Sequence, residues 1–405
     1  MEHGFATRAV HAGRTDLAGL GVHAPPIDLS TTYPTPDLDK AAFSFDSLVM
    51  GDAPQGNFIY QRLFNPTTDR FERALAELEG AEDAAAFSSG MATLSAVLLA
   101  AKVRGSHVVA VRPMYGTADH LLSSGLLGLD VTWALQDEIT QALRPDTALV
   151  FIETPANPTL DLVDIAAVVR QAGVIPVLVD STFATPVLQQ PLALGAALVI
   201  HSATKFLGGH GDVLAGVVAG SHEMVRDIKH VRAATGGVLH PLSSFLLHRS
   251  VPTLQLRVER AQATAVVLAE RLAEDARVAG VRFPGLAGQD TRGLIGRQMK
   301  GPGSLISFEL AGSTPAVMRD FVGALKLITP AVSLGSTDTL IQPPALLTHR
   351  VVDAEARAET GITSGLLRLS VGLEDARDLW QDLDQALRVV SAQATLRPAE
   401  PLAGV

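Results

Sequence analysis

The chain has 405 residues, of which 47% are hydrophobic and 18% charged, and its formal net charge is −10; this length suits two or three packed domains, and the acidic balance argues against a nucleic-acid partner. It contains no cysteine, so disulfides, thiolate metal sites and a cysteine nucleophile are excluded. The first residues show no basic run followed by an apolar core, and no apolar stretch is long enough to cross a bilayer, so we expect a cytoplasmic protein without membrane contact.

Residues 1–64 are predicted to form an irregular N-terminal arm. Prolines interrupt every potential helix of this segment, at Pro25, Pro26, Pro34, Pro36 and Pro54. A segment this long without regular structure is unusual unless it packs on another surface. The alternative interpretation is a loose terminus.

An α/β pattern begins at Asn65, and we assign residues 65–260 to one domain. A helix is expected from Arg70 to Glu79, with Thr67–Asp69 capping its start and Gly80 its end. Further helices are expected at Met91–Val103, Leu162–Ala172 and Pro191–Leu194. Short apolar strands are expected at Ala84–Phe87, His107–Val111, Ala148–Glu153, Pro176–Asp180, Ala197–His201 and Leu214–Ala219. Apolar strands that do not alternate with polar residues are typical of a parallel sheet covered on both faces, so a mostly parallel sheet is predicted.

Residues 261–405 are predicted to form a smaller α+β domain. A long helix from about Pro252 to Glu274 leads into it. The expected strands are Ser304–Leu310 and Leu366–Ser370, and the expected helices are Pro315–Ala324 and Asp375–Val390. The residues from Pro398 onward read as a loose tail.

The most informative motif is the glycine-rich loop Ser202–His210, which follows the apolar strand Leu198–His201. A lysine just past a buried strand loses solvation, which lowers its pKa and frees the amine to attack a carbonyl. Lys205 is therefore a candidate for a Schiff base, and the hydroxyls of Ser202 and Thr204 are candidate donors to a phosphate. A solvated lysine on a turn is the structural alternative.

Asp180 closes the preceding apolar strand, Val177–Asp180. A carboxylate there is costly unless it has a partner, and a protonated pyridine nitrogen is such a partner, which makes the ring an electron sink. An N-cap is the more common role of an isolated aspartate. Because Asp180 and Lys205 would end successive strands at the carboxyl edge, where ligands bind in open α/β sheets, we expect them to share one site.

A phosphate site is predicted where Phe87–Met91 joins a strand to a helix. Gly90 lets the backbone approach an anion, and the free N–H groups at a helix start favour one. Small residues before a helix are more often a simple cap. Arg62, in the arm, is a candidate cation for the same phosphate, which would bring the arm onto a partner subunit.

Three further side chains suit a bound amino acid and its cofactor. Tyr115 follows the strand His107–Val111, where its ring can stack on a pyridine and its hydroxyl can transfer a proton. Asn157 follows another strand and can bind the cofactor's 3-oxygen and a substrate carboxylate. Arg368 lies between apolar residues of the strand-like Leu366–Gly372, and a carboxylate would accept its guanidinium bidentately. A structural ion pair is the alternative for Arg368.

Other chemistries find less support in the sequence. The 12 histidines show no metal-ligand spacing, so no metal site is predicted. No nucleophile elbow, Walker loop or G-x-G-x-x-G opens a helix after a strand.

Taken together, these motifs resemble the Cys/Met-metabolism family of enzymes that use pyridoxal 5′-phosphate (PLP). The resemblance implies the α/β architecture of fold type I, like that of the aspartate aminotransferases, with a mostly parallel sheet domain and a smaller C-terminal α+β domain. It covers nearly the whole chain, through Tyr60–Pro66, Leu78–Met91, Met114–Thr117, Glu153–Thr159, Val179–Ser181, His201–Gly211, Ser333–Leu340 and Arg368–Glu374.

The resemblance also implies a role for each matching residue. Lys205 would hold PLP and shuttle protons, Asp180 would bind its ring nitrogen, and Tyr115 would stack on the ring. The phosphate would be bound by Gly90, Met91, Ser202 and Thr204, joined by Tyr60 and Arg62 from the neighbouring subunit. The substrate would be positioned by Asn157, Ser333 and Arg368. Family members are typically tetramers built from two active-site dimers, so a homotetramer is expected.

Within the family, the chain is most similar to the methionine and cystathionine γ-lyases. It departs from the methionine γ-lyase pattern at Thr117, where cysteine is usual, and at Arg232-Ala233, where Lys-Asp is usual. Asp338 stands where cystathionine enzymes usually have glutamate. We expect these four positions to bear on specificity, with Thr117 and Asp338 near the substrate.

The predicted reaction is γ-elimination on a sulfur-containing L-amino acid such as methionine, homocysteine or cystathionine, giving a 2-oxo acid, ammonia and a thiol. The alternative within the family is γ-replacement, as in a cystathionine γ-synthase or an O-acylhomoserine sulfhydrylase, because the two reactions share their early steps. A nucleotide-binding dehydrogenase and a PLP-fold protein without catalysis are alternatives of other classes. The first lacks the glycine fingerprint, and the candidate catalytic residues argue against the second.

Overall fold

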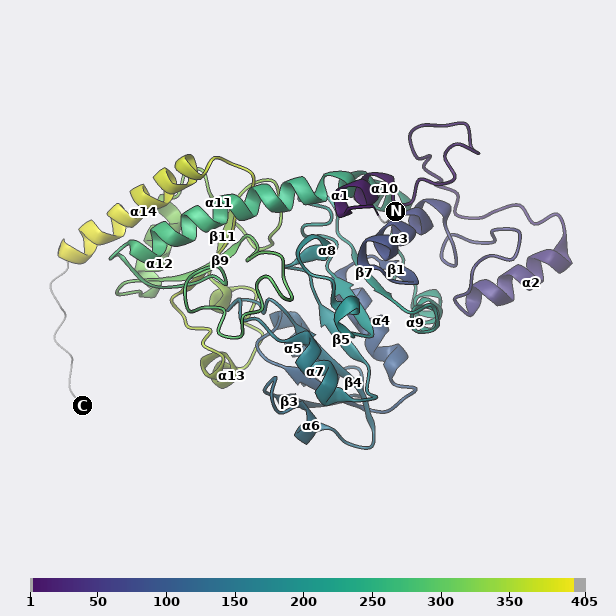
Figure 1. Ribbon diagram of the computed structural model, residues 1–405, viewed down its shortest axis with the longest axis horizontal. Helices are drawn as coiled ribbons and strands as arrows, with labels where there is room; N and C mark the ends of the chain where they lie inside the picture. The colour runs from purple at the N-terminus through teal and green to yellow at the C-terminus, as the bar shows by residue number, and fades with distance from the viewer. Residues whose placement is uncertain (1–2, 397–405) are drawn as a thin grey trace.

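The computed structural model describes residues 3–396 and contains two sheets (Figure 1). The larger sheet has seven strands in the order β1-β7-β6-β5-β4-β2-β3. Its strands are β1 (Asp83–Phe87), β2 (His107–Val111), β3 (Asp130–Ala134), β4 (Thr147–Glu153), β5 (Val177–Asp180), β6 (Leu198–His201) and β7 (Gly216–Gly220). All neighbours are parallel except β7, which runs antiparallel to both β1 and β6. The predicted mostly parallel sheet is therefore confirmed.

The strand β3 is missing from the sequence-based prediction. It lies at the edge of the sheet, paired with β2 alone, and none of its residues is fully buried. An edge strand that keeps one side in solvent lacks the continuous apolar run by which its neighbours were recognised. The six predicted strands are all present, with their starts displaced by no more than two residues.

Helices cover both faces of this sheet. On one face lie α4 (Gly90–Ala101), α5 (Gly116–Ser123) and α9 (His222–Thr235), which pack on alternate residues of the strands. On the other face lie α3 (Pro66–Glu79), α7 (Ile165–Ala172), α8 (Thr185–Leu188) and α10 (Pro241–Ser250). The remaining short elements around this sheet are α6 (Ile139–Ala142) and the 3₁₀ turns η1 (Pro191–Leu194) and η2 (Val251–Thr253).

The start of α3 differs from the prediction for a local reason. The side chain of Asn65 accepts hydrogen bonds from the backbone N–H groups of Thr67 and Thr68, and Pro66 occupies the first helical position. Asn65 is therefore the N-cap, and the polar residues expected to cap the helix form its first turn instead. Gly80 ends the helix in the left-handed conformation, as predicted.

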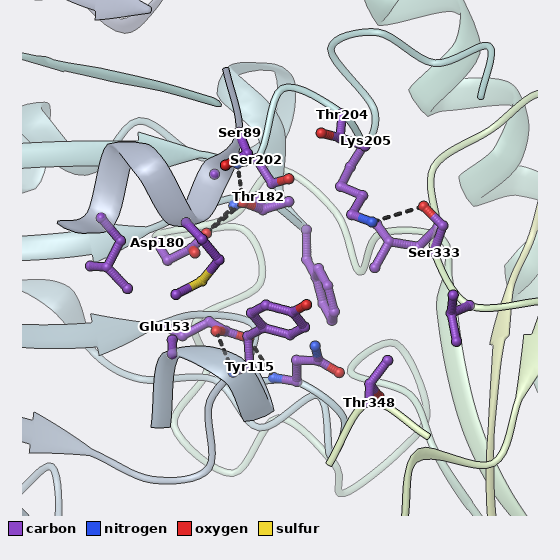
Figure 2. Close-up of a pocket in the computed structure, with 18 of the residues that line it drawn as sticks. Ser89, Tyr115, Glu153, Asp180, Thr182, Ser202, Thr204, Lys205, Ser333 and Thr348 are labelled. Atoms are coloured by element: carbon purple, nitrogen blue, oxygen red, sulfur yellow. Dashed lines mark hydrogen bonds between the residues drawn. The ribbon is translucent and has the colours of Figure 1, made fainter. Parts of the chain in front are cut away.

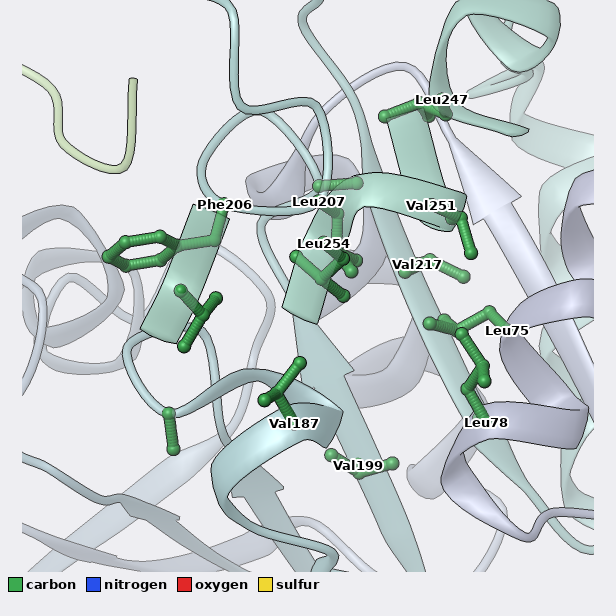
Figure 3. Packing of buried hydrophobic residues seen from close by; sticks show 14 of the residues in the cluster. Leu75, Leu78, Val187, Val199, Phe206, Leu207, Val217, Leu247, Val251 and Leu254 are labelled. Carbon is green, nitrogen blue, oxygen red and sulfur yellow. The ribbon is translucent and has the colours of Figure 1, made fainter. Parts of the chain in front are cut away.

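A hydrophobic cluster anchors the loop that carries Lys205. Phe206 and Leu207, the next two residues, are 4% and 1% exposed, and both pack in the cluster that joins α3, β6, β7 and α10 (Figure 3). The packing of Phe206 and Leu207 in this cluster holds the loop after β6 in place. The side chain of Lys205 is thereby directed away from the core.

The smaller sheet has five strands in the order β10-β11-β12-β9-β8. Its elements are β8 (Val278–Arg282), β9 (Leu305–Leu310), β10 (Thr329–Pro330), β11 (Leu340–Gln342), β12 (Leu366–Ser370), η3 (Pro344–Leu346) and the helices α12 (Pro315–Ala324), α13 (Ala354–Glu359) and α14 (Ala376–Leu396). In β12, Leu367 and Leu369 join the core under α12 and α14. Arg368 points to the opposite face, because successive residues of a strand alternate.

The long helix α11 (Leu254–Glu274) runs from the first sheet to the second (Figure 1). The proposed boundary between residues 260 and 261 therefore falls inside a continuous helix. The predicted tail from Pro398 lies outside the described residues. No helix within residues 3–396 is long and apolar enough to cross a membrane.

The arm contains two helices, so the expectation that prolines interrupt every helix was wrong. α1 (Phe5–His11) packs beside α3, and α2 (Leu38–Val49) lies at one end of the molecule (Figure 1). Asp37 caps α2 by accepting a hydrogen bond from the N–H of Lys40. The prolines at 36 and 54 stand before and after α2, where they do not remove a helical hydrogen bond.

Candidate active site

A cavity of about 550 Å³ opens at the carboxyl edge of the larger sheet (Figure 2). One wall comes from the ends of β4, β5 and β6 and the start of α4, and the other from residues 332–334, 347–348 and β12. The sequence-predicted residues that line it are Gly90, Met91, Tyr115, Asn157, Asp180, Ser202, Thr204, Lys205, Ser333 and Arg368. Segments far apart in the sequence thus contribute to one chamber.

Lys205 projects into this cavity and its Nζ donates a hydrogen bond of 2.8 Å to Ser333 Oγ (Figure 2). Burial, followed by the nearby charge of Arg368, lowers the pKa of Lys205 to about 8. Ser333 is held with a φ of 106°, a conformation that L-residues rarely adopt. A lysine with such a pKa has an appreciable neutral fraction near pH 7, as nucleophilic and proton-transfer roles require.

Asp180 faces the cavity with one carboxylate oxygen already held. Its Oδ1 accepts hydrogen bonds from the backbone N–H and the hydroxyl of Thr182, at 2.9 and 2.6 Å. Thr182 Oγ1 in turn accepts from the N–H of Ser202, so the turns after β5 and β6 are linked. Burial raises the pKa of Asp180, and no ion pair to it occurs among residues 3–396. A cation facing this carboxylate would compensate its desolvation.

Glu153, to which the sequence assigned no role, is a second carboxyl group of the site. It ends β4 beside Asp180 in the parallel register, and it lines the cavity. Burial and the charge of Asp180 raise the pKa of Glu153 well above its usual range. Its two oxygens accept the N–H groups of Tyr115 and Asn157, each at 2.8 Å. The signal that pointed to Asp180, an acidic residue closing an apolar strand, was equally present at Glu153.

The start of α4 meets the loop after β6 closely. Ser89 caps the helix by accepting the N–H of Ala92, which leaves the N–H groups of Gly90 and Met91 without helical partners. A Cβ on Gly90 would lie 3.0 Å from the Ser202 side chain. Thr204 lines the same region, but its hydroxyl exchanges two hydrogen bonds with the backbone of Ala215. To donate to a phosphate, Thr204 would have to release the carbonyl of Ala215.

Arg368 is 2% exposed and reaches the cavity from β12. Its Nη1 donates to Asn157 Oδ1 at 2.8 Å and its Nη2 to the carbonyl of Ser333 at 2.9 Å. Both acceptors are uncharged, and Nε is buried with no partner in the described part of the chain. The guanidinium is therefore a buried cation that forms no ion pair within residues 3–396, which fits a site for a carboxylate.

Four predicted residues do not line this cavity. Tyr60 is 45% exposed, and Arg62 stacks on it and donates to the carbonyl of Ala233. Thr117 lies in the first turn of α5, half-buried, and Asp338 is exposed and accepts a hydrogen bond from Ser336.

Arg232 lies away from the cavity as well. It pairs with Glu72 and donates to the carbonyl of Ala86, so it joins α9 to α3 and β1.

Apolar residues complete the cavity and were not predicted from the sequence. Phe183, Leu214, Val332, Leu334 and Leu347 line it together with Thr348. Isolated apolar residues in loops carry no pattern that distinguishes a cavity wall from ordinary surface.

Comparison with known proteins agrees with this geometry. Residues 6–388 match the family model described as Cys/Met metabolism PLP-dependent enzyme. The chain is 54% identical over 391 residues to an L-methionine gamma-lyase from Brevibacterium sandarakinum, which covers 96% of this chain and 98% of that protein. It is also 54% identical to an L-methionine gamma-lyase from Streptomyces avermitilis, covering 94% of this chain and 88% of that protein.

Solved structures show the same fold. A cystathionine gamma synthase from Xanthomonas oryzae pv. oryzae superposes with a TM-score of 0.89 at 37% identity, covering 97% of this chain and 100% of that one. A cystathionine gamma lyase from Micromonospora echinospora superposes with a TM-score of 0.85 at 41% identity, covering 96% and 100%.

Proposed function

This chain belongs to the Cys/Met metabolism PLP-dependent enzymes, and on that premise we propose that it is a carbon–sulfur lyase. The proposed reaction is γ-elimination on a sulfur-containing L-amino acid such as methionine, homocysteine or cystathionine, which releases a 2-oxo acid, ammonia and a thiol. The observation that carries the proposal is the placement of Lys205, Asp180 and Arg368 in one cavity. The similarity to methionine gamma-lyases over nearly the full length supports the choice of elimination.

The residues of the cavity fit PLP. The desolvated Lys205 amine suits a bond to an aldehyde. Asp180 is desolvated and forms no ion pair among the described residues, so a protonated pyridine nitrogen would supply its missing cation. The free N–H groups at the start of α4, beside Ser202, suit a phosphate. Tyr115 lines the same cavity, below Asp180 and Lys205 in the view of Figure 2, and its ring can cover the pyridine face.

When bound, PLP supplies an electron sink for negative charge at the substrate Cα. The chain's own residues would bind and orient the amino acid and move its protons. Arg368 and Asn157 would hold the carboxylate, with Ser333 beside them. Lys205, whose pKa of about 8 allows it both to accept and to donate a proton, would move protons at Cα and Cβ, and Tyr115 would donate one to the departing sulfur.

The second candidate is γ-replacement, in which a thiol adds to the Cγ position after the first group has left. The superposition with a cystathionine gamma synthase supports γ-replacement as this second candidate. The cavity residues named above serve the steps that both reactions share, so product analysis must separate them.

We also propose that the active protein is a cytoplasmic homo-oligomer, a tetramer formed from two active-site dimers, in which Tyr60 and Arg62 serve the partner's cavity. Neither residue lines the cavity of its own chain, which supports this arrangement. The arm also exposes large apolar side chains, among them Leu29, Phe43 and Phe45, which an interface would cover. Sedimentation of the purified protein should give the mass of four chains, and a monomer would refute the shared site.

The function is tested by a product panel. Purified enzyme with PLP is incubated with methionine, homocysteine, cystathionine, cysteine and O-acetyl- or O-succinyl-homoserine, with and without an added thiol. We expect 2-oxo acid and a thiol from a sulfur amino acid without added thiol. A new thioether formed from an O-acylhomoserine would favour replacement instead.

The control is Lys205→Ala, which should lose the visible absorption of covalently held PLP together with the activity. A wild-type protein that stays colourless and inert with added PLP would overturn the proposal.

A further inference from the structure

Tyr115 and Asn157 come from different turns, one after β2 and one after β4. Strand geometry alone does not fix how the two turns sit against each other, because each lies in an irregular segment beyond its strand. A first link between them is Glu153, whose Oε2 accepts the Tyr115 N–H and whose Oε1 accepts the Asn157 N–H. Figure 2 shows Glu153 next to Tyr115, joined by this hydrogen bond. One carboxyl group thus holds both turns by their N–H groups.

A second link is His349, a fully buried histidine from the segment between η3 and α13. Its Nε2 lies 3.1 Å from the carbonyl oxygen of Met114 and 3.2 Å from that of Asn157. Carbonyl oxygens only accept hydrogen bonds, so Nε2 must carry the proton. One N–H group thus holds the same two turns by their carbonyl groups.

The other ring nitrogen of His349, Nδ1, also has a hydrogen-bond partner. With Nε2 protonated in a neutral ring, Nδ1 is an acceptor, so the hydroxyl of Thr348 donates to it at 3.1 Å. Thr348 Oγ1 then accepts from Nε2 of Gln342, also at 3.1 Å, and Gln342 pairs in register with Arg368. Burial, and then the charge of Arg368, lower the pKa of His349 to about 4, which keeps the ring in the neutral form that these directions require.

The two links act on the same short stretches of backbone. The carbonyl of Met114 and the N–H of Tyr115 belong to one peptide unit, which is held at one end by His349 and at the other by Glu153. Asn157 is held through two successive peptide units, because its N–H group bonds to Glu153 and its carbonyl group to His349. Peptide groups bonded in this way are restrained against rotation, so the backbone from which the Tyr115 and Asn157 side chains project keeps one orientation.

The segment that carries His349 also meets the Tyr115 turn directly. A Cβ on Gly116 would lie 2.3 Å from the carbonyl oxygen of Thr348, so the two backbones are in contact where Thr348 lines the cavity. The segment around Thr348 and His349 therefore packs directly against the turn that contains Tyr115.

We propose that Glu153 and His349 are positioning residues, which together hold Tyr115 and Asn157 in the orientation needed to cover the cofactor and bind the substrate. This inference rests on the proposed function for its kinetic consequence, but its effect on the cofactor's surroundings does not depend on which substrate is used.

The test compares His349→Phe and His349→Gln with His107→Phe. His107 is a matched control, because it is also fully buried and its two ring nitrogens bond to Thr147 and Thr132, at 2.8 and 2.9 Å. It begins β2, at the end of the strand opposite the cavity. Each phenylalanine variant removes ring hydrogen bonds from a buried site of similar size.

For each variant, the melting temperature, the affinity for PLP, the visible circular dichroism of bound PLP, and kcat and KM are measured. Both phenylalanine variants should melt at lower temperature. Only the His349 variant should change the visible circular dichroism, and its kcat/KM should fall roughly ten- to a hundredfold, as expected for reacting groups displaced by about 1 Å. His349→Gln, whose amide can keep one N–H donor, should fall between it and the wild type.

Glu153→Gln provides an independent variant. Its amide oxygen can accept only one of the two N–H groups while its NH₂ group opposes the other, so it should alter the same visible signal.

Unchanged circular dichroism and kcat/KM in His349→Phe, with a loss of stability like that of His107→Phe, would overturn the inference. If His349→Phe does not fold, the same comparison is made with His349→Gln, and unchanged values there overturn it equally. If the wild type releases no product from any amino acid, the proposed function fails, while the circular dichroism and PLP affinity still decide the role of Glu153 and His349.

Discussion

Replacing Arg368 with glutamine or lysine separates a substrate-binding role from a structural one. In the free protein the guanidinium donates to two uncharged acceptors and its Nε has no partner among residues 3–396. Glu153 acts on it electrostatically but forms no ion pair with it, and burial raises the pKa of that carboxyl. Burial also lowers the pKa of Arg368 itself, to about 10. The free protein therefore maintains a desolvated cation that a substrate carboxylate would stabilise.

The magnitude follows from these contacts. A hydrogen bond to a charged group contributes about 1.5–3 kcal/mol, so losing one such bond to the substrate raises KM roughly ten- to a hundredfold. For folding, Arg368→Gln gives up hydrogen bonds to Asn157 and Ser333 but also removes the cost of burying an unpaired charge, and these effects oppose each other. We expect the free energy of unfolding to change by no more than about 1 kcal/mol.

The assay is steady-state release of 2-oxo acid over a range of substrate concentrations, together with urea unfolding of each variant without substrate. Arg368→Lys keeps the charge but not the planar fork, so its KM should lie between those of the wild type and Arg368→Gln. An Arg368→Gln protein that is destabilised by more than about 3 kcal/mol, as when a buried pair is broken, and that keeps the wild-type KM would refute this reasoning and show a structural role.

Three further predictions follow from the same contacts. Because burial lowers the pKa of His349 to about 4, the unfolded chain binds this proton more readily, so the free energy of unfolding should fall by about 1.5 kcal/mol between pH 6.5 and pH 5. Urea unfolding at both pH values should show this loss in the wild type and not in His349→Gln, and equal pH dependence would contradict it. Asp180→Asn should still bind PLP covalently at Lys205 but lower kcat roughly 10²- to 10³-fold, as measured with saturating substrate; near-normal turnover would exclude a charge partner at Asp180. Gly116→Ala places a Cβ 2.3 Å from the Thr348 carbonyl oxygen, so it should lower the free energy of unfolding by about 1–3 kcal/mol and raise KM. The control is Gly323→Ala, in open space within α12, which should change neither quantity.

The residues proposed to carry the chemistry were identifiable from the sequence because each has a local signature. Asp180 and Lys205 each follow a short apolar strand, and parallel strands end at one edge of a sheet, so chain order alone placed them together. The structure brings both to one cavity. The roles given to Tyr60 and Arg62 remain proposals, since a single chain does not bring them there.

Other features had no such signature. In the arm, α1 has only 7 residues and α2 lies between Pro36 and Pro54, and β3 is a partly exposed edge strand, so their patterns are weak. Glu153 had the same signal as Asp180, but its function lies in the backbone groups that it binds, and those depend on how two turns meet.

What the sequence determined by itself was therefore the family, the mostly parallel sheet and the set of polar side chains at its carboxyl edge, because these depend on residue type and on order along the chain. Tertiary structure alone decided which distant segments complete the site. Arg368 reaches Asn157 across 211 positions of sequence and His349 reaches Met114 across 235. Such contacts depend on how the second sheet packs against the first, which no local pattern of residues records.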